Sequence, residues 1–212
     1  MINILLDKLP ETVKIDNVDY PIKYGFKDII KIEILMFGEL PDEEKFEKAL
    51  DMFFMGNIPK NEDQAVEKLL WFFYCGKLKK NSSTGGSANT RRAYCFESDA
   101  SYIYSAFQTQ YNINLNKINS EALHWWEFSA MFDNLHEEHQ ISRIIYYRTA
   151  DLKGLSNNQK KFIKQMRKKY ELKKPDSGLD SETRLAKRNA DMKAYVKRRM
   201  QGVSEQNKMP LL

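Results

Sequence analysis

Apolar and polar residues alternate near the start of the chain. Between Val13 and Ile22 every second position is apolar, and the pair Asp16-Asn17 interrupts this alternation in the middle. Such a pair between two alternating runs is a turn signal, so we expect a small β-hairpin at this point. Pro21 has no backbone N–H to donate, which places it on an edge of the sheet.

From residue 26 onwards the apolar residues recur every three or four positions, which is the spacing of amphipathic helices. Glycines at 38, 56 and 76 interrupt the pattern. The pattern predicts helices over roughly residues 26–37, 42–55, 61–75, 100–111, 121–135, 138–149, 159–170 and 181–200. Short oxygen-bearing side chains cap helix starts well, so we expect Ser98 or Asp99 to cap the fourth helix and Asn119 or Ser120 the fifth.

A stretch without apolar anchors divides the helical pattern. Residues 81–87 read Asn-Ser-Ser-Thr-Gly-Gly-Ser, a composition typical of a flexible linker. We predict a mainly α fold: a helical domain with a small N-terminal β-hairpin and a basic C-terminal helical extension. The predicted segments are a hairpin and helical half over residues 1–76, a Gly/Ser linker over 77–93, an aromatic-rich helical half over 94–174, and a basic helix with a disordered tail over 175–212.

The net charge of +5 conceals an asymmetry along the chain. Residues 160–200 hold fifteen Lys or Arg and five Asp or Glu, whereas residues 1–159 hold eighteen and twenty-three. A basic segment of this kind can neutralise phosphates, bind an acidic protein or form a solvated helix face. No recognised nucleic-acid-reading motif accompanies the charge and aromatic residues are sparse there, so nucleic acid is the less favoured partner.

The chain shows no sign of a membrane or secretory segment. No run of about 18 apolar residues occurs, so we expect no membrane span. The first seven residues lack the charged start, long apolar stretch and cleavage site of a signal peptide. We therefore expect the protein to stay in the cytoplasm of the cell that makes it.

The histidines are the best candidates for a catalytic or metal-binding site in this sequence. His136 and His139 stand three apart, but two imidazoles fall short of the three or four ligands that zinc prefers. His124 and Glu127 could hydrogen-bond on one helix, yet an acid–base pair also needs a cleft and a nucleophile. No phosphate loop, dinucleotide fingerprint or nucleophile elbow occurs. We predict no catalytic residue, metal or cofactor, and therefore no enzyme.

The charged helices are better candidates for binding a partner than for catalysis. Arg148 follows two tyrosines and precedes Asp151. Its guanidinium could stack on a tyrosine and pair with Asp151 inside the protein, or it could contact a partner, and the two interpretations are equally good. The last predicted helix has an apolar stripe too thin to hold it on a core alone, so it docks on a partner or remains mobile. The candidate partner-binding residues are Arg143, Arg148, Lys164, Arg167, Lys168, Leu185, Met192 and Val196.

One series of segments resembles a known phage family. The segments are Phe96-Glu97-Ser98-Asp99, Ile103-Tyr104-Ser105-Ala106-Phe107, Gln110-Tyr111-Asn112-Ile113-Asn114-Leu115, Leu123-His124-Trp125-Trp126-Glu127-Phe128 and Ile144-Ile145-Tyr146-Tyr147-Arg148-Thr149. In this order they resemble the phage protein family called gene product fifteen. The resemblance covers roughly residues 10–170, and the linker and the basic C-terminal helix lie outside its motifs.

The resemblance implies a role in virus assembly. Members look like tail assembly chaperones of long-tailed phages and prophages of Gram-positive bacteria, acting in the host cytoplasm. A chaperone of this kind would bind the tape measure protein, keep that long helical chain soluble and leave during assembly. Other tail proteins or a second copy of the chain are further partners that it allows. Two alternatives stay open: a structural tail or connector component of the virion, and a nucleic-acid-binding regulator.

Overall fold

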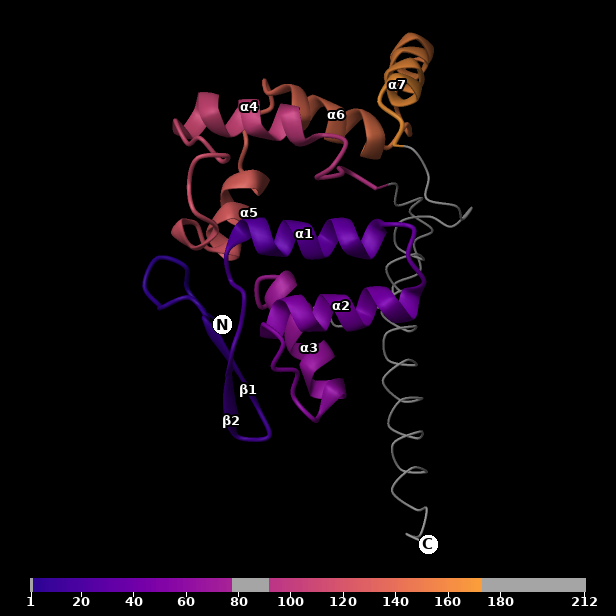
Figure 1. The fold of residues 1–212 in the computed structure, drawn as a ribbon. Coiled ribbons are helices and arrows are strands. Elements are labelled where there is room, and N and C mark those ends of the chain that lie inside the picture. Colours follow the sequence, from indigo (N-terminus) through magenta and orange to yellow (C-terminus); the bar gives the residue numbers. More distant parts are fainter. Residues whose placement is uncertain (1, 78–91, 173–212) are drawn as a thin grey trace, which may run out of the picture.

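The structure, a computed structural model, describes residues 2–77 and 92–172 (Figure 1). Its elements are β1 (Thr12–Ile15), β2 (Val18–Pro21), α1 (Phe26–Phe37), α2 (Asp42–Phe54), α3 (Glu62–Phe73), α4 (Ala100–Tyr111), the 3-10 turn η1 (Ser120–Ala122), α5 (Trp125–Asp133), α6 (Gln140–Thr149) and α7 (Asn157–Lys169). The predicted mainly helical class with an N-terminal hairpin is confirmed. Most of the predicted linker, the last predicted helix and the tail lie outside the described residues.

The hairpin forms where the alternation predicts it. β1 and β2 pair antiparallel with Val13 opposite Tyr20, and both turn residues, Asp16 and Asn17, have positive φ angles. Positive φ at both central positions gives the turn the twist that a two-residue hairpin needs. The Asp16 carboxylate also accepts hydrogen bonds from the side chains of Asn61 and Gln64 at the start of α3. The hairpin is thereby tied to the helical body.

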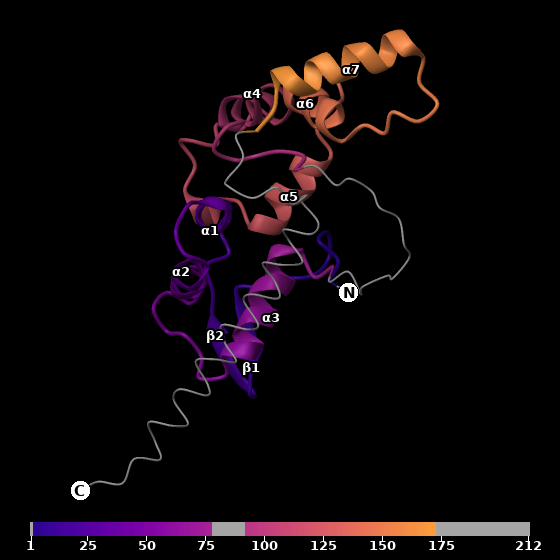
Figure 2. The same cartoon turned by 90° about the vertical axis from the view of Figure 1, so that its right-hand side faces the viewer.

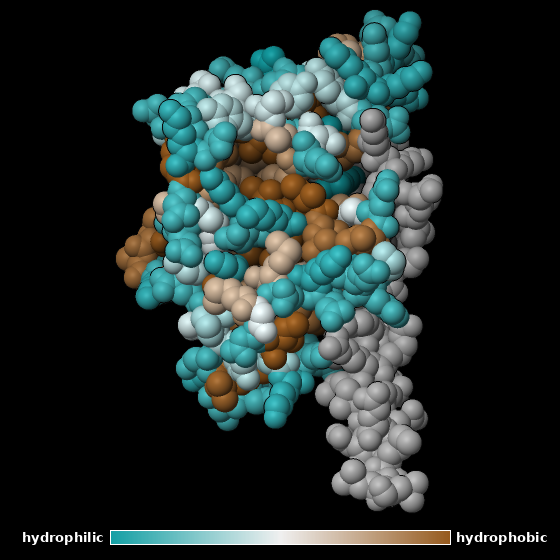
Figure 3. Space-filling view, in the orientation of Figure 1, coloured by the Kyte–Doolittle hydropathy of each residue, from teal (hydrophilic) through white to brown (hydrophobic). Residues whose placement is uncertain are grey.

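The helices form tiers that Figures 1 and 2 show from two sides. The hairpin, α2 and α3 make the lower part, α1 and α5 lie in the middle, and α4, α6 and α7 form the upper end. α1 packs against both α2 and α5, so it lies between the two halves of the sequence. Hydrophobic surface is visible between α1 and the upper tier in the space-filling view (Figure 3).

One hydrophobic core draws on both sides of the predicted linker. Phe26 stacks on Phe128 with 5.2 Å between ring centroids, and Phe107 stacks on Phe128 at 4.9 Å. The indole N–H groups of Trp125 and Trp126 donate to the backbone carbonyls of α3 at Phe73 (3.0 Å) and Phe72 (2.8 Å). The predicted boundary therefore separates two stretches of sequence that bury their side chains together.

The fifth helix begins later than the sequence predicts. Residues before it form η1, and the backbone of His124 is extended and makes a bridge with Gly25. The N–H of Trp125 donates to the carbonyl of Tyr24 (2.8 Å), and the N–H of Phe26 donates to Leu123 (3.1 Å). This pairing with the start of α1 keeps α5 from beginning at residue 121. The predicted caps Asn119 and Ser120 are therefore wrong, and His124 is the N-cap.

Gly25 explains how closely these two segments approach. A Cβ atom at this position would lie 2.6 Å from the backbone carbonyl of Ser120, closer than real side chains come. A glycine is therefore needed for the α1–η1 contact. None of the helices in the described ranges combines the length and the apolar character that crossing a bilayer requires.

Candidate partner-binding groove

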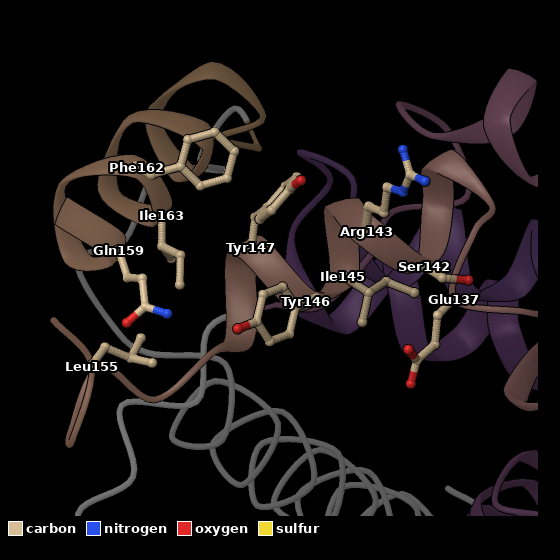
Figure 4. Close-up of a pocket in the computed structure, with 10 residues that line it drawn as sticks. All are labelled: Glu137, Ser142, Arg143, Ile145, Tyr146, Tyr147, Leu155, Gln159, Phe162 and Ile163. Carbon is tan, nitrogen blue, oxygen red and sulfur yellow. The ribbon is translucent and has the colours of Figure 1, made fainter.

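A groove of about 640 Å³ lies between α6 and α7 at the upper end of the molecule. Aromatic and aliphatic side chains form most of its surface, with a few polar groups among them (Figure 4). Its lining residues are Glu137, Ser142, Arg143, Ile145, Tyr146, Tyr147, Leu155, Gln159, Phe162 and Ile163. Concave, mainly apolar surfaces with a few polar groups are typical binding sites.

The aromatic side chains of the groove are only partly covered. Tyr146 is 53% exposed and Phe162 is 50% exposed. Between them, Tyr147 makes edge-to-face contacts with both rings at centroid distances of 5.9 Å, and it stacks on Tyr170 at 6.3 Å. Figure 4 shows Phe162 of α7 and Tyr147 of α6 turned toward one another. The packing fixes these rings while leaving apolar area open to a ligand.

α7 is amphipathic, and its start is well defined. Ser156 accepts a hydrogen bond from the N–H of Gln159, whose side chain accepts one from the N–H of Ser156, so the two form a capping box. Phe162 and buried Ile163 lie on the groove side. The exposed residues at positions 161, 164 and 168 are lysines that follow the opposite face at helical spacing. The helix thus presents an apolar face to the groove and a basic face to solvent.

A buried ion pair between Arg148 and Asp99 connects α6, one side of the groove, to the start of α4. The Arg148 guanidinium donates to both Asp99 carboxylate oxygens, at 2.6 and 3.0 Å, and Arg148 is 5% exposed. Its remaining contacts are donations to the carbonyls of Tyr170 (2.7 Å) and Ala93 (3.1 Å). Arg148 therefore connects α6 to the start of α4 and to the end of α7.

Two sequence predictions are corrected by this pair. The predicted partner Asp151 is wrong, because that carboxylate is exposed and accepts the N–H of Lys153 instead. Asp99 stands at the N-cap position as predicted, but its side chain makes no cap hydrogen bond. Its carboxylate binds Arg148 and the N–H of Cys95 (2.9 Å), and a bidentate partner of opposite charge is stronger than a cap. Arg148 is an internal residue and not part of the surface.

The other predicted partner-binding residues fall in different places. Arg143 is exposed and lines the groove. Arg167 is half-buried and donates to the carbonyls of Tyr147 (3.0 Å) and Ala150 (2.8 Å), so it caps the end of α6. Lys164 and Lys168 are exposed on the outer face of α7 and do not line the groove. The remaining three, Leu185, Met192 and Val196, lie outside the described residues.

Sequence reasoning missed most of the groove. Tyr146 and Phe162 are its largest exposed aromatic side chains, and neither was a candidate. Phe162 had a signal, because it is an aromatic residue inside a strongly basic helix. Tyr146 had none, since an adjacent pair of aromatic residues on a helix is equally typical of a core.

His124 takes a structural position in the middle of the molecule. Its Nδ1 accepts the N–H of Trp126 (3.0 Å), which leaves the proton on Nε2 to donate to the carbonyl of Pro10 (3.1 Å). The Glu127 carboxylate accepts the N–H of His124 at 3.0 Å, completing the cap of α5. Burial lowers the pKa of His124 below its usual value, although the contact with Pro10 and the charge of Glu127 act in the opposite direction. Both ring nitrogens are therefore engaged in holding the fold.

The second pair of histidines lies at the start of α6. The rings of His136 and His139 stack at 6.0 Å, and Nε2 of His139 is 2.9 Å from the side-chain oxygen of Gln110. Among residues 2–77 and 92–172, no three His, Cys, Asp or Glu side chains gather in a way that could hold a metal ion. The absence of a cofactor stays a prediction.

Comparison with known proteins identifies the family. The family described as "Bacteriophage Gp15 protein" matches residues 5–172, which is well over half of the chain. Searches of curated proteins and of solved structures found no match. The matched range contains the hairpin, every described helix and the whole groove. Because the match extends over nearly all of the described residues, the chain belongs to the bacteriophage Gp15 protein family.

Proposed function

We propose that this phage protein is a tail assembly chaperone that binds the tape measure protein through the α6–α7 groove. The observation that carries the proposal is the pair of half-exposed aromatic side chains, Tyr146 and Phe162, in a mainly apolar groove. A tape measure protein is long and helical, and it presents apolar helix faces before the tail tube surrounds it. Such faces dock in apolar grooves through residues spaced three or four apart.

The groove has the composition of a binding hot spot. Aromatic and Arg residues contribute most of the binding energy in many interfaces, and Tyr146, Phe162 and Arg143 supply that combination. Tyr147 contacts both exposed rings and restricts their motion, so little side-chain freedom is lost on binding. The groove thus favours a helix with large apolar anchors and an acidic residue opposite Arg143.

The lysines on the outer face of α7 have a separate part in this proposal. They do not line the groove, so they contribute through the long-range field that steers an acidic helix toward it. Steering of this kind raises the association rate and weakens as salt is added. We expect binding of the client to show moderate salt dependence, carried mainly by its on-rate.

The proposal assigns no chemical step to the protein. The ring of His124 contacts the N–H of Trp126 and the carbonyl of Pro10, and Arg148 makes four hydrogen bonds to internal acceptors. Among the described residues that line the groove there are one carboxylate, Glu137, and one serine, Ser142, and no histidine. We therefore propose a binding protein and not an enzyme.

The test is co-expression with the long helix-rich protein encoded beside this one, followed by a pull-down with nuclease treatment at low and high salt. The wild-type chain should keep the long protein soluble and co-purify with it. The variant Tyr146→Ser/Phe162→Ser should lose it, because truncating one interface anchor costs about 2 kcal/mol, or roughly thirtyfold in affinity. Tyr104→Ser is the matched control, since Tyr104 is an exposed tyrosine on α4 outside the groove.

The pull-down and the composition of purified virions separate the alternatives. A nucleic-acid-binding regulator is supported by one observation, the exposed aromatic rings beside a basic helix, because bases stack on such rings. In that case nucleic acid would co-purify and nuclease would release it, while the long protein stayed insoluble. A structural tail component would instead be found in purified virions in amounts comparable with other tail proteins. Either result would contradict the chaperone proposal.

A further inference from the structure

The first residues of the chain form a projecting turn with two leucines at its tip. Leu5 is 87% exposed and Leu6 is 82% exposed. The turn spans Asn3 to Asp7, and its two flanks are anchored because Ile2 and Leu9 pack against the core. In Figure 3, hydrophobic surface protrudes at the left edge of the view, where Figure 1 draws this turn.

Hydrogen bonds fix the shape of this turn. The N–H of Asn3 donates to the Asp7 carboxylate (2.7 Å), and the side-chain oxygen of Asn3 accepts the N–H of Leu5 (2.9 Å). The carbonyl of Asn3 accepts the N–H groups of Leu6 (3.1 Å) and Asp7 (2.8 Å). Four hydrogen bonds within five residues hold the two leucines outward. Apolar side chains that are exposed side by side, and not scattered singly, favour an interaction surface.

The α6–α7 groove has the features that complement this turn. The turn offers two adjacent aliphatic side chains followed by the carboxylate of Asp7. The described lining of the groove is mainly apolar and carries two charged side chains, the guanidinium of Arg143 and the carboxylate of Glu137. We propose that the Leu5-Leu6 turn of one copy of the protein inserts into the α6–α7 groove of a second copy. Asp7 of the inserted turn would then lie opposite Arg143 of the receiving copy.

The turn cannot reach the groove of its own chain. Figures 1 and 2 both place the turn in the lower part of the molecule and α7 at its upper end. The two surfaces are therefore different patches of one molecule, and contact between copies is heterologous. Repeated contacts of this kind form a ring if the rotation closes and an open chain if it does not.

The inference goes beyond the proposed function, because self-association needs no client. It also links the two, since a client helix and the turn of a second copy would occupy the same groove. Binding of the client would then dissolve the self-association. The apolar groove of the chaperone would stay covered by the turn of another copy until a client displaces that copy.

The test is sedimentation velocity of the full chain, without client, over a wide concentration range. The wild type should associate with increasing concentration. Leu5→Ser/Leu6→Ser and Tyr146→Ser/Phe162→Ser should each weaken association by roughly a hundredfold or more, because each removes one side of the same contact. Val18→Ser is the matched control, because Val18 is an exposed aliphatic residue on β2, and it should associate like the wild type.

Mixing the two double variants gives the sharpest result. The first keeps an intact groove and the second keeps an intact turn, so their mixture has one functional contact and should form a heterodimer that grows no further. A monomeric wild type at the highest attainable concentration, unchanged association of either variant, or a mixture without heterodimer would each overturn the proposal. Loss of client binding by the turn variant would also overturn it, by assigning the turn to the client. Self-association and client binding are measured separately, so one can fail while the other stands.

Discussion

Helices α5 and α6 each carry an adjacent pair of aromatic residues, and one pair is buried while the other is partly exposed. Trp125 and Trp126 at the start of α5 are buried, and both indole N–H groups donate to backbone carbonyls of α3. In α6, Tyr146 is half exposed and Tyr147 is partly covered by Phe162. The same local pattern thus contributes to the core in one place and to an exposed surface in the other.

The difference lies in what surrounds each helix. α5 lies against α1, and its tryptophans reach α3, so its aromatic residues find neighbours on several sides. α6 packs against α4 and α7 and buries Ile141, Ile144 and Arg148, all on one face. Ile145 and Tyr147 are only partly covered, and Tyr146 is exposed. A helix at the end of a fold has fewer neighbours, and this makes its aromatic residues available for partners.

Phe128→Ala should give the largest loss of stability. Its ring is 0% exposed and stacks on Phe26, Phe107 and Trp125. Removing a fully buried phenyl ring leaves a cavity, so we expect the free energy of unfolding to fall by about 4 kcal/mol in urea titrations. Phe162→Ala, on the groove side, should cost less than about 1 kcal/mol. Equal decreases in the free energy of unfolding for the two variants would show that the groove residue is packed as tightly as the core residue.

Arg148→Met should cost nearly as much, although the site lies close to the groove. The substitution leaves the Asp99 carboxylate buried without its guanidinium partner, a change that costs about 3 kcal/mol. Hydrogen exchange should also rise at the end of α7, because the carbonyl of Tyr170 loses its donor. Arg143→Met on the same helix removes an exposed arginine and should stay within about 0.5 kcal/mol.

Stability should depend on the protonation of His124. Its pKa in the folded protein is lowered by burial, while the unfolded chain has the usual value of 6.5. Below pH 6.5 the histidine is protonated in the unfolded chain but still neutral in the folded protein. The contribution of His124 to the free energy of unfolding is therefore fully present above pH 6.5, and it is lost as the pH falls through the pKa of the folded state. Protonating Nδ1 also removes the acceptor for the N–H of Trp126, and loss of such a cap costs about 1 kcal/mol.

The matched variant for this pH effect is His124→Asn, which keeps a capping oxygen and cannot titrate near neutral pH. Chemical unfolding between pH 5 and 8 should show a smaller slope for it than for the wild type. His136 and His139 are present in both proteins, so they cannot account for the difference. An unchanged slope would show that His124 does not carry the pH dependence.

A small effect on stability should accompany the largest effect on binding. Tyr146→Ser/Phe162→Ser should change the free energy of unfolding by less than about 1 kcal/mol, because both side chains are about half exposed. The same variant should lose the client and the second copy. If the free energy of unfolding instead fell by several kcal/mol, the two side chains would belong to the core. The proposals that use the groove as a binding surface would then be wrong.

Local patterns in the sequence determined the hairpin and most helix boundaries. Asp16-Asn17 sets the turn through its own backbone preferences, and the helices over 26–37 and 42–54 follow directly from apolar spacing and from Gly38 and Pro41. These features depend on residues close together in the chain, so they are accessible without the fold. The family could also be identified at this level, because its motif residues lie in short segments in a fixed order.

Tertiary structure alone decided the roles of the polar residues and the position of the groove. His124 caps α5 because the backbone before it pairs with Tyr24 and Phe26, about a hundred residues away in the sequence. Arg148 binds Asp99, 49 residues distant, and not its near neighbour Asp151, since a buried carboxylate attracts a guanidinium more strongly than a solvated one does. Whether an aromatic pair is buried or exposed depends on how many other elements surround its helix, and a single helix does not contain that information.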